Sequence, residues 1–247
     1  MRAILALPLL MLAATGAAAQ PPAWVPGMRW QPTEPYVTVG QDEPGYRNWY
    51  MAAPWHAGYI KAFNDYLTAY GVAGIVPTWQ LLRTASDWQK CGAQPFEIPP
   101  SETWPNVVQT LRYVRDQVIP VLGAVEPVSA YRNPDLNQCA QGARESAHRY
   151  FQAVDLVPLS PITRDAMIRA LCRVHATSGE PYGVGLGFYV GLRFHIDSRK
   201  FRTWGVNDEG TIACARSYDL AHARDAARAP AAASQAPDSA VPEPQKP

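Results

Sequence analysis

Two histidines and one aspartate in the second half of the chain are the side chains best suited to hold a metal ion. His148 precedes Asp155 by seven positions in "SAHRYFQAVDL", and His195 lies in the later segment "RFHIDS". Two imidazoles and one carboxylate form a ligand set of catalytic zinc sites, in which a fourth position stays open for water. Such an ion lowers the pKa of its water and polarises a carbonyl, so hydrolysis of an amide is the expected chemistry.

Two segments that alternate like β-strands carry or flank these side chains. In "QAVDL" Asp155 points to one face, and in "RFHIDS" Arg193, His195 and Asp197 share a face. If the two strands are neighbours, His148 in the loop before the first strand converges with Asp155 and His195. The alternative is a polar surface loop that binds nothing.

Apolar residues at helical spacing predict four helices around these strands. The first begins at His56 and ends before "GVAG", and a second, short helix spans residues 78–88. The most regular helix begins at residues 103–104 and ends at Pro120, and another begins at Ser160.

Four segments read as strands, and together with the helices they predict the fold class. They are "VEPVS", "QAVDLVP", and the two arms of a hairpin, "GVGLGFYV" and "LRFHIDS". This order predicts an α+β fold with a small, mostly antiparallel sheet and flanking helices, preceded by a helical N-terminal annex.

Two further features have structural explanations. Gly183, Gly185 and Gly187 in "GVGLGFYVG" do not open a helix and lack the Lys-Ser/Thr ending of a phosphate loop, so we expect strand glycines that allow close packing near the site. His175, near the end of a predicted helix, is expected to cap that helix or to lie at the surface.

The two ends of the chain differ in composition from its centre. Residues 1–19 have a charged start, a short apolar run and small residues before Gln20, which is typical of a secretory signal peptide. We expect an annex over residues 20–100, a main domain over 101–222 and a disordered Ala/Pro-rich tail over 223–247. The protein is therefore expected to be exported to the periplasm or the extracellular space, with no membrane span. A net charge of +1 gives no electrostatic reason to expect nucleic acid as a partner.

Four cysteines in an exported chain predict two disulfides. No two of them form a CxxC pair, so a zinc ribbon is disfavoured. Three pairings are possible, and we favour Cys91 with Cys139 and Cys172 with Cys214.

The ordered motifs "SAYRNPDLN", "SAHRYFQAVDL" and "FHID" followed by "RTWG" resemble the zinc D-alanyl-D-alanine peptidase family, over residues 105–205. This family includes D-Ala-D-Ala carboxypeptidases and murein endopeptidases of the bacterial envelope, and hedgehog signalling domains share its fold. The resemblance implies that His148, Asp155 and His195 bind one Zn²⁺ per chain. It also implies that Arg132 holds a substrate carboxylate or polarises the scissile carbonyl, and that Ser146 supports the loop or a substrate peptide.

The chain departs from the family pattern at three positions. Phe151 replaces a glycine, so the loop is not expected to use a glycine-only conformation there. Leu192 and Arg193 replace the glutamate that serves some members as base and the histidine found in other lineages.

The identity of the base therefore stays open. Asp197 is expected to act as the base or proton shuttle, or to orient a ligand histidine with Arg193 as its ion-pair partner. Glu145 is a weaker candidate for the base.

The resemblance implies an exported zinc metallopeptidase that cuts amide bonds next to D-amino acids in peptidoglycan stem peptides or cross-links. The second hypothesis is a catalytically silent, zinc-stabilised module that binds peptidoglycan or a protein, which the absent glutamate at Leu192 favours. A third is a disulfide-stabilised envelope protein without a metal. The sequence does not separate a carboxypeptidase from an endopeptidase.

Overall fold

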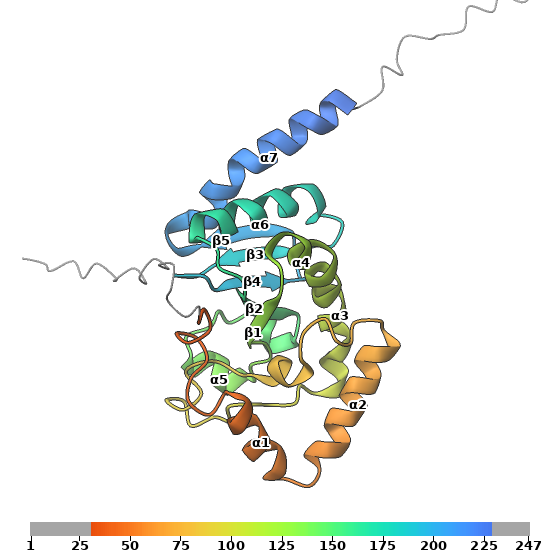
Figure 1. The fold of residues 1–247 in the computed structure, drawn as a ribbon, viewed down its shortest axis with the longest axis vertical. Helices are drawn as coiled ribbons and strands as arrows, with labels where there is room; N and C mark the ends of the chain where they lie inside the picture. Colours follow the sequence, from red (N-terminus) through yellow and green to blue (C-terminus); the bar gives the residue numbers. More distant parts are fainter. Residues whose placement is uncertain (1–30, 229–247) are drawn as a thin grey trace, which may run out of the picture.

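The computed structural model describes residues 31–228 (Figure 1). The predicted signal peptide and residues 229–247 of the predicted tail lie outside the described residues. Helix α7, Glu209–Arg228, extends beyond residue 223, so the first residues of the predicted tail are helical. No helix within residues 31–228 has the length and apolar character to cross a membrane.

The fold is α+β and is built on one five-stranded sheet. The strands are β1 Val125–Ser129, β2 Ala153–Pro158, β3 Gly185–Phe188, β4 Phe194–Asp197 and β5 Arg202–Gly205. Their order is β1-β2-β4-β3-β5, and every neighbouring pair is antiparallel except β3 and β5. The predicted hairpin of β3 and β4 is present. The parallel strand β5 was not predicted, and it makes the sheet mixed.

The helices cover the sheet and extend away from it (Figure 1). The α-helices are α1 Glu43–Met51, α2 His56–Ala69, α3 Trp104–Tyr113, α4 Ile119–Leu122, α5 Pro134–Cys139, α6 Arg164–Ser178 and α7. Shorter helical turns lie at Thr78–Leu82, Ser101–Thr103, Val114–Val118, Ala147–Tyr150 and Val206–Asp208. In Figure 1, α6 and α7 lie at one end of the molecule and the annex helices α1 and α2 at the other.

Three predicted helix boundaries were wrong. Helix α6 begins at Arg164 and not at Ser160, because the Thr163 hydroxyl accepts a hydrogen bond from Ala166 N and caps the helix. The helix predicted over residues 78–88 is only a single 3₁₀ turn, after which Arg83 is extended.

The helical path continues through Pro120 to Leu122, where the sequence predicted an end. The turn Val114–Val118 before it is π-helical. A proline clashes with the carbonyl one α-turn earlier and cannot donate a hydrogen bond to it, and a wider π turn accommodates both effects.

The annex shares its hydrophobic core with the rest of the molecule. Phe63 of α2 is fully buried, and its ring centroid lies 5.1 Å from that of Trp104 and 5.8 Å from that of Phe151. Arg83 is also buried: its Nε donates to Gln41 O, and its guanidinium pairs with Glu126 of β1 at 2.6 Å. The annex is therefore joined to the sheet by apolar packing and by a buried ion pair.

Both disulfides favoured from the sequence are present. Cys91 pairs with Cys139, and Cys172 of α6 pairs with Cys214 of α7. Two disulfides fit an exported protein.

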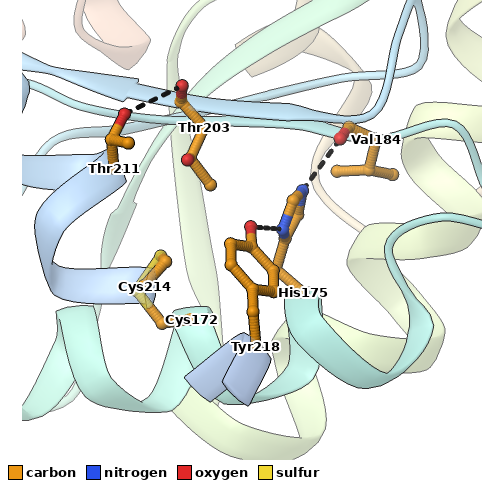
Figure 2. Close-up of a disulfide and its surroundings, with 7 residues drawn as sticks. All are labelled: Cys172, His175, Val184, Thr203, Thr211, Cys214 and Tyr218. Atoms are coloured by element: carbon orange, nitrogen blue, oxygen red, sulfur yellow. Dashed lines mark hydrogen bonds between the residues drawn. A yellow bond between two sulfur atoms is a disulfide. The ribbon is translucent and has the colours of Figure 1, made fainter. Parts of the chain in front are cut away.

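Figure 2 shows that His175 lies beside the Cys172–Cys214 disulfide, and its predicted place at the surface was wrong. The ring is fully buried. Its Nε2 donates to Val184 O at 2.8 Å, and its Nδ1 accepts from the Tyr218 hydroxyl at 2.6 Å. Burial lowers the pKa of His175, so the imidazole is neutral.

Candidate metal centre

Two neighbouring strands and one helical turn position the predicted ligands. In the register of β2 and β4, Asp155 lies directly opposite His195, so their side chains share one face of the sheet. His148 comes from the turn Ala147–Tyr150 just before β2, whose N-cap Ser146 accepts a hydrogen bond from His148 N. The pairing of β2 with β4 and the capped turn before β2 thus bring His148, Asp155 and His195 together.

The three side chains converge on one point. His148 Nε2 lies 3.2 Å from both Asp155 Oδ1 and His195 Nδ1, and the latter two atoms are 2.9 Å apart. Ligands about 2.0–2.1 Å from a tetrahedral zinc ion lie about 3.3 Å from one another. The buried group is therefore close to the size needed for one ion, and it can hold a metal.

The outer nitrogens of both imidazoles fix their tautomers. His148 Nδ1 lies 2.5 Å from Ala130 O, and His195 Nε2 lies 2.9 Å from Asp197 Oδ2, so each of these nitrogens donates its hydrogen outward. The converging nitrogens then present lone pairs to each other and to a carboxylate oxygen. When both rings are neutral, three acceptors face one another in this buried site, and a cation between them would satisfy all three.

The pKa values of the group follow from burial and from its charged neighbours. Burial lowers the pKa of His148 to about 4, and the charge of Arg132 reinforces the effect. Burial opposes the charge of Asp155, but His148 and Arg193 outweigh it and hold its pKa well below the usual range. Burial likewise opposes protonation of His195, but its hydrogen bonds to two carboxylates raise its pKa. A metal ion that binds here therefore competes with a proton for His195 Nδ1.

Asp197 lies behind His195, on the side opposite the converging nitrogens. Its Oδ2 accepts from His195 and, at 2.7 Å, from Arg202, while its Oδ1 accepts from Arg202 and from Arg199 N. Burial opposes its charge, but His195 and Arg202 outweigh this and lower its pKa. Both oxygens are engaged, so the geometry favours the orienting role. The expectation that Arg193 forms the ion pair with Asp197 was wrong, because Arg202 forms it and Arg193 binds Asp155.

Arg132 and Arg193 both bind the outer oxygen of Asp155, a predicted ligand. Arg132 lies 3.1 Å and Arg193 2.5 Å from Asp155 Oδ2, and the Arg193 guanidinium stacks 4.3 Å from the Tyr189 ring centre. The Nε atoms of both arginines are buried and have no hydrogen-bond partner within the described chain. Two guanidiniums beside one carboxylate leave the wall with excess positive charge, which suits an anionic ligand.

A cleft of about 560 Å³ opens onto this group. Its lining includes Ala85, Ser86, Asp87, Arg132, Ala140, Gln141, Gly142, Ala143, Glu145, Ser146, Ala147, His148, Tyr189, Arg193, His195, Arg202 and Trp204. The annex turn at residues 85–87 forms part of one wall, and the loop at residues 140–147 forms part of another. The Cys91–Cys139 disulfide links the chain segments that carry these two parts.

One residue, Ala130, connects the annex to a predicted ligand. Ala130 N donates to Arg83 O at 3.0 Å, and Ala130 O accepts from His148 Nδ1. The orientation of His148 therefore depends on the place of the annex segment next to β1.

Gly185 and Gly187 of β3 allow close packing, as expected, whereas Gly183 lies in the preceding turn with φ 61°. A Cβ at Gly187 would lie 2.1 Å from the ring of Trp204, and one at Gly185 would lie 2.3 Å from both Arg202 and Asp197. The Trp204 ring lies 5.2 Å from that of His195. These glycines therefore let β5 place Trp204 and Arg202 against the site.

The expectation for Phe151 was wrong. It adopts a left-handed conformation with φ 53° and ψ 31° directly after the turn that carries His148. This conformation costs roughly 1–2 kcal/mol for a non-glycine residue. The Phe151 ring is fully buried and packs against Phe63 and Tyr131, which offsets the cost.

Sequence reasoning missed Tyr189, Arg202, Trp204 and Asp87 as residues of the cleft. The segment "RTWG" contains two of them and contributed to the resemblance, but its strand was not predicted. Asp87 lies in the annex, outside the resemblance, and had no motif to mark it. Searches of protein-family models, curated proteins and solved structures found no match to this chain.

Proposed function

We propose that this protein is an exported zinc metallopeptidase that hydrolyses amide bonds next to D-amino acids in peptidoglycan stem peptides or cross-links. The observation that carries the proposal is the convergence of His148 Nε2, Asp155 Oδ1 and His195 Nδ1, with the outer nitrogen of each ring held by an acceptor. The ordered sequence motifs, which resemble the D-alanyl-D-alanine peptidase family, support both the zinc and the substrate class.

The residues around the cleft fit such a reaction. A zinc ion held by the two imidazoles and the carboxylate would activate water and polarise the scissile carbonyl. Arg132 borders the ion site and the cleft, and its guanidinium suits a substrate carboxylate or the developing oxyanion. Ser146 holds the turn that carries His148 through the hydrogen bond to His148 N.

A zinc-stabilised binding module with the hedgehog type of fold is the second candidate. Leu192 replaces the glutamate that serves some members as base, and Asp197 has no free oxygen. These two observations favour a site that binds zinc without turnover.

Metal analysis combined with digestion of cross-linked muropeptides tests both candidates. The purified mature protein should contain about one zinc per chain, as a single three-ligand site requires. Mass spectrometry should then detect loss of D-alanine or splitting of dimers. Zinc with intact muropeptides would favour the binding module, and protein that binds no metal would contradict both candidates.

A further inference from the structure

We propose that Asp87, which the annex contributes to the cleft, accepts the proton of the attacking water. This inference rests on the proposed function and deepens it by naming the base. The family's glutamate is absent, because Leu192 stands in its place and has no group that can take a proton.

Two carboxylates of the described chain are excluded as bases by their contacts. Asp155 uses Oδ1 in the ligand group and Oδ2 for two arginines. Asp197 has both oxygens engaged by His195, Arg202 and a backbone N–H. The remaining carboxylates that line the cleft are Asp87 and Glu145.

Glu145 is held at the rim of the cleft by other side chains. Its Oε2 lies 3.3 Å from the Tyr150 hydroxyl and 3.3 Å from Arg199, and its side chain is 62% exposed. Arg199 also donates to Glu145 O, which fixes the pair together. These contacts hold the Glu145 carboxylate at the rim, so it is not free to meet a water molecule in the cleft.

Asp87 combines a fixed backbone with a free side chain. Cys91 N donates to Asp87 O at 2.9 Å, Ala85 O accepts from Gln41 Nε2, and the Cys91–Cys139 disulfide anchors the turn to the last residue of α5. Asp87 lines the cleft, and its carboxylate makes no hydrogen bond or ion pair within residues 31–228. A positioned carboxylate without a protein partner keeps its lone pairs for a water molecule or for the substrate.

The proton movement balances with Asp87 as acceptor. The water oxygen bonds to the carbonyl carbon while one Asp87 oxygen takes a water proton. When the C–N bond breaks, the Asp87 carboxyl gives this proton to the leaving nitrogen. The products are a carboxylic acid and an amine, and Asp87 returns to its ionised form.

The test compares Asp87→Asn with the matched variant Glu145→Gln in the full mature chain loaded with zinc. Loss of a general base should lower kcat of Asp87→Asn on cross-linked muropeptides by about 10²–10⁴-fold. KM, zinc content and the dissociation constant of a cleaved muropeptide measured by calorimetry should stay unchanged. The acidic limb of the wild-type kcat profile against pH should be absent from the residual activity. Glu145→Gln should retain the acidic limb of the pH profile that Asp87→Asn lacks.

Two results would overturn the assignment. An active wild type whose Asp87→Asn variant keeps its kcat would remove Asp87 as the base and leave the proposed function intact, and loss of kcat in Glu145→Gln alone would move the role to Glu145. A wild type that binds zinc but leaves muropeptides intact would overturn the proposed function and this assignment with it.

Discussion

His148 and His175 are both buried, and the partners of their ring nitrogens separate a metal ligand from a structural histidine. His175 donates from one nitrogen to a carbonyl and accepts at the other from the Tyr218 hydroxyl, so a neutral ring is fully satisfied. His148 donates to Ala130 O, but its other nitrogen faces Asp155 and His195, which are acceptors as well. Burial alone therefore does not mark a candidate metal ligand; the partners of the second ring nitrogen do.

The largest expected effect is the loss of metal in His148→Ala. The substitution removes one of three ligands, so stoichiometric zinc and peptidase activity should both disappear. Metal analysis of the purified variant measures this directly. His175→Ala is the control: it should retain the metal while losing roughly 1–3 kcal/mol of stability, because it leaves buried partners unsatisfied. Zinc retained by His148→Ala would remove the ligand assignment.

The second prediction concerns the disulfide beside His175. It closes a loop with a sequence separation of 42. Replacing both Cys172 and Cys214 with Ser should lower the free energy of unfolding by about 2–5 kcal/mol. Zinc affinity should not change, because the bond joins α6 to α7 away from the ligand group. Denaturant unfolding and a zinc titration measure the two quantities, and a large loss of zinc affinity would contradict the separation of the two regions.

The third prediction separates the two roles considered for Asp197. If it orients His195, Asp197→Asn should weaken zinc binding by about 10–100-fold. At saturating zinc the variant should keep most of its kcat. A chelator competition titration gives the affinity. Unchanged affinity together with lost turnover would instead assign the proton transfer to Asp197.

The smallest effect is a pH dependence that originates at His175. Its pKa is lowered in the folded protein by burial, so its contribution to stability is present above the unfolded value of about 6.5 and is lost as the pH falls toward the folded pKa. His175→Gln has no such titration. The difference in unfolding free energy between metal-free wild type and this variant should therefore shrink from pH 7 to pH 5 in denaturant titrations. A difference that stays constant with pH would show that His175 keeps its charge state.

The sequence predicted the ligand group better than its surroundings, for physical reasons. Side chains alternate along a strand with a period of two, so the sequence predicts which residues share a face. Asp155 and His195 therefore lie on the same face of the sheet once β2 and β4 pair. The pairing of Asp197 with Arg202 depends on strand β5, which pairs in parallel with β3. No local sequence pattern indicates this pairing. The left-handed Phe151 also escaped prediction, because its cost is offset by contacts with Phe63 of the annex and with Tyr131.

The hydrogen bonds of Ala130 set the smallest unit of the chain that should be studied in isolation. The family resemblance covers residues 105–205, which suggests a natural point of truncation before residue 101. Such a fragment would lose Arg83 O, the acceptor for Ala130 N, and with it the support of the carbonyl that orients His148. It would also expose the core face that Phe63 covers. The annex is therefore part of the minimal folding unit, and recombinant fragments should begin upstream of α1.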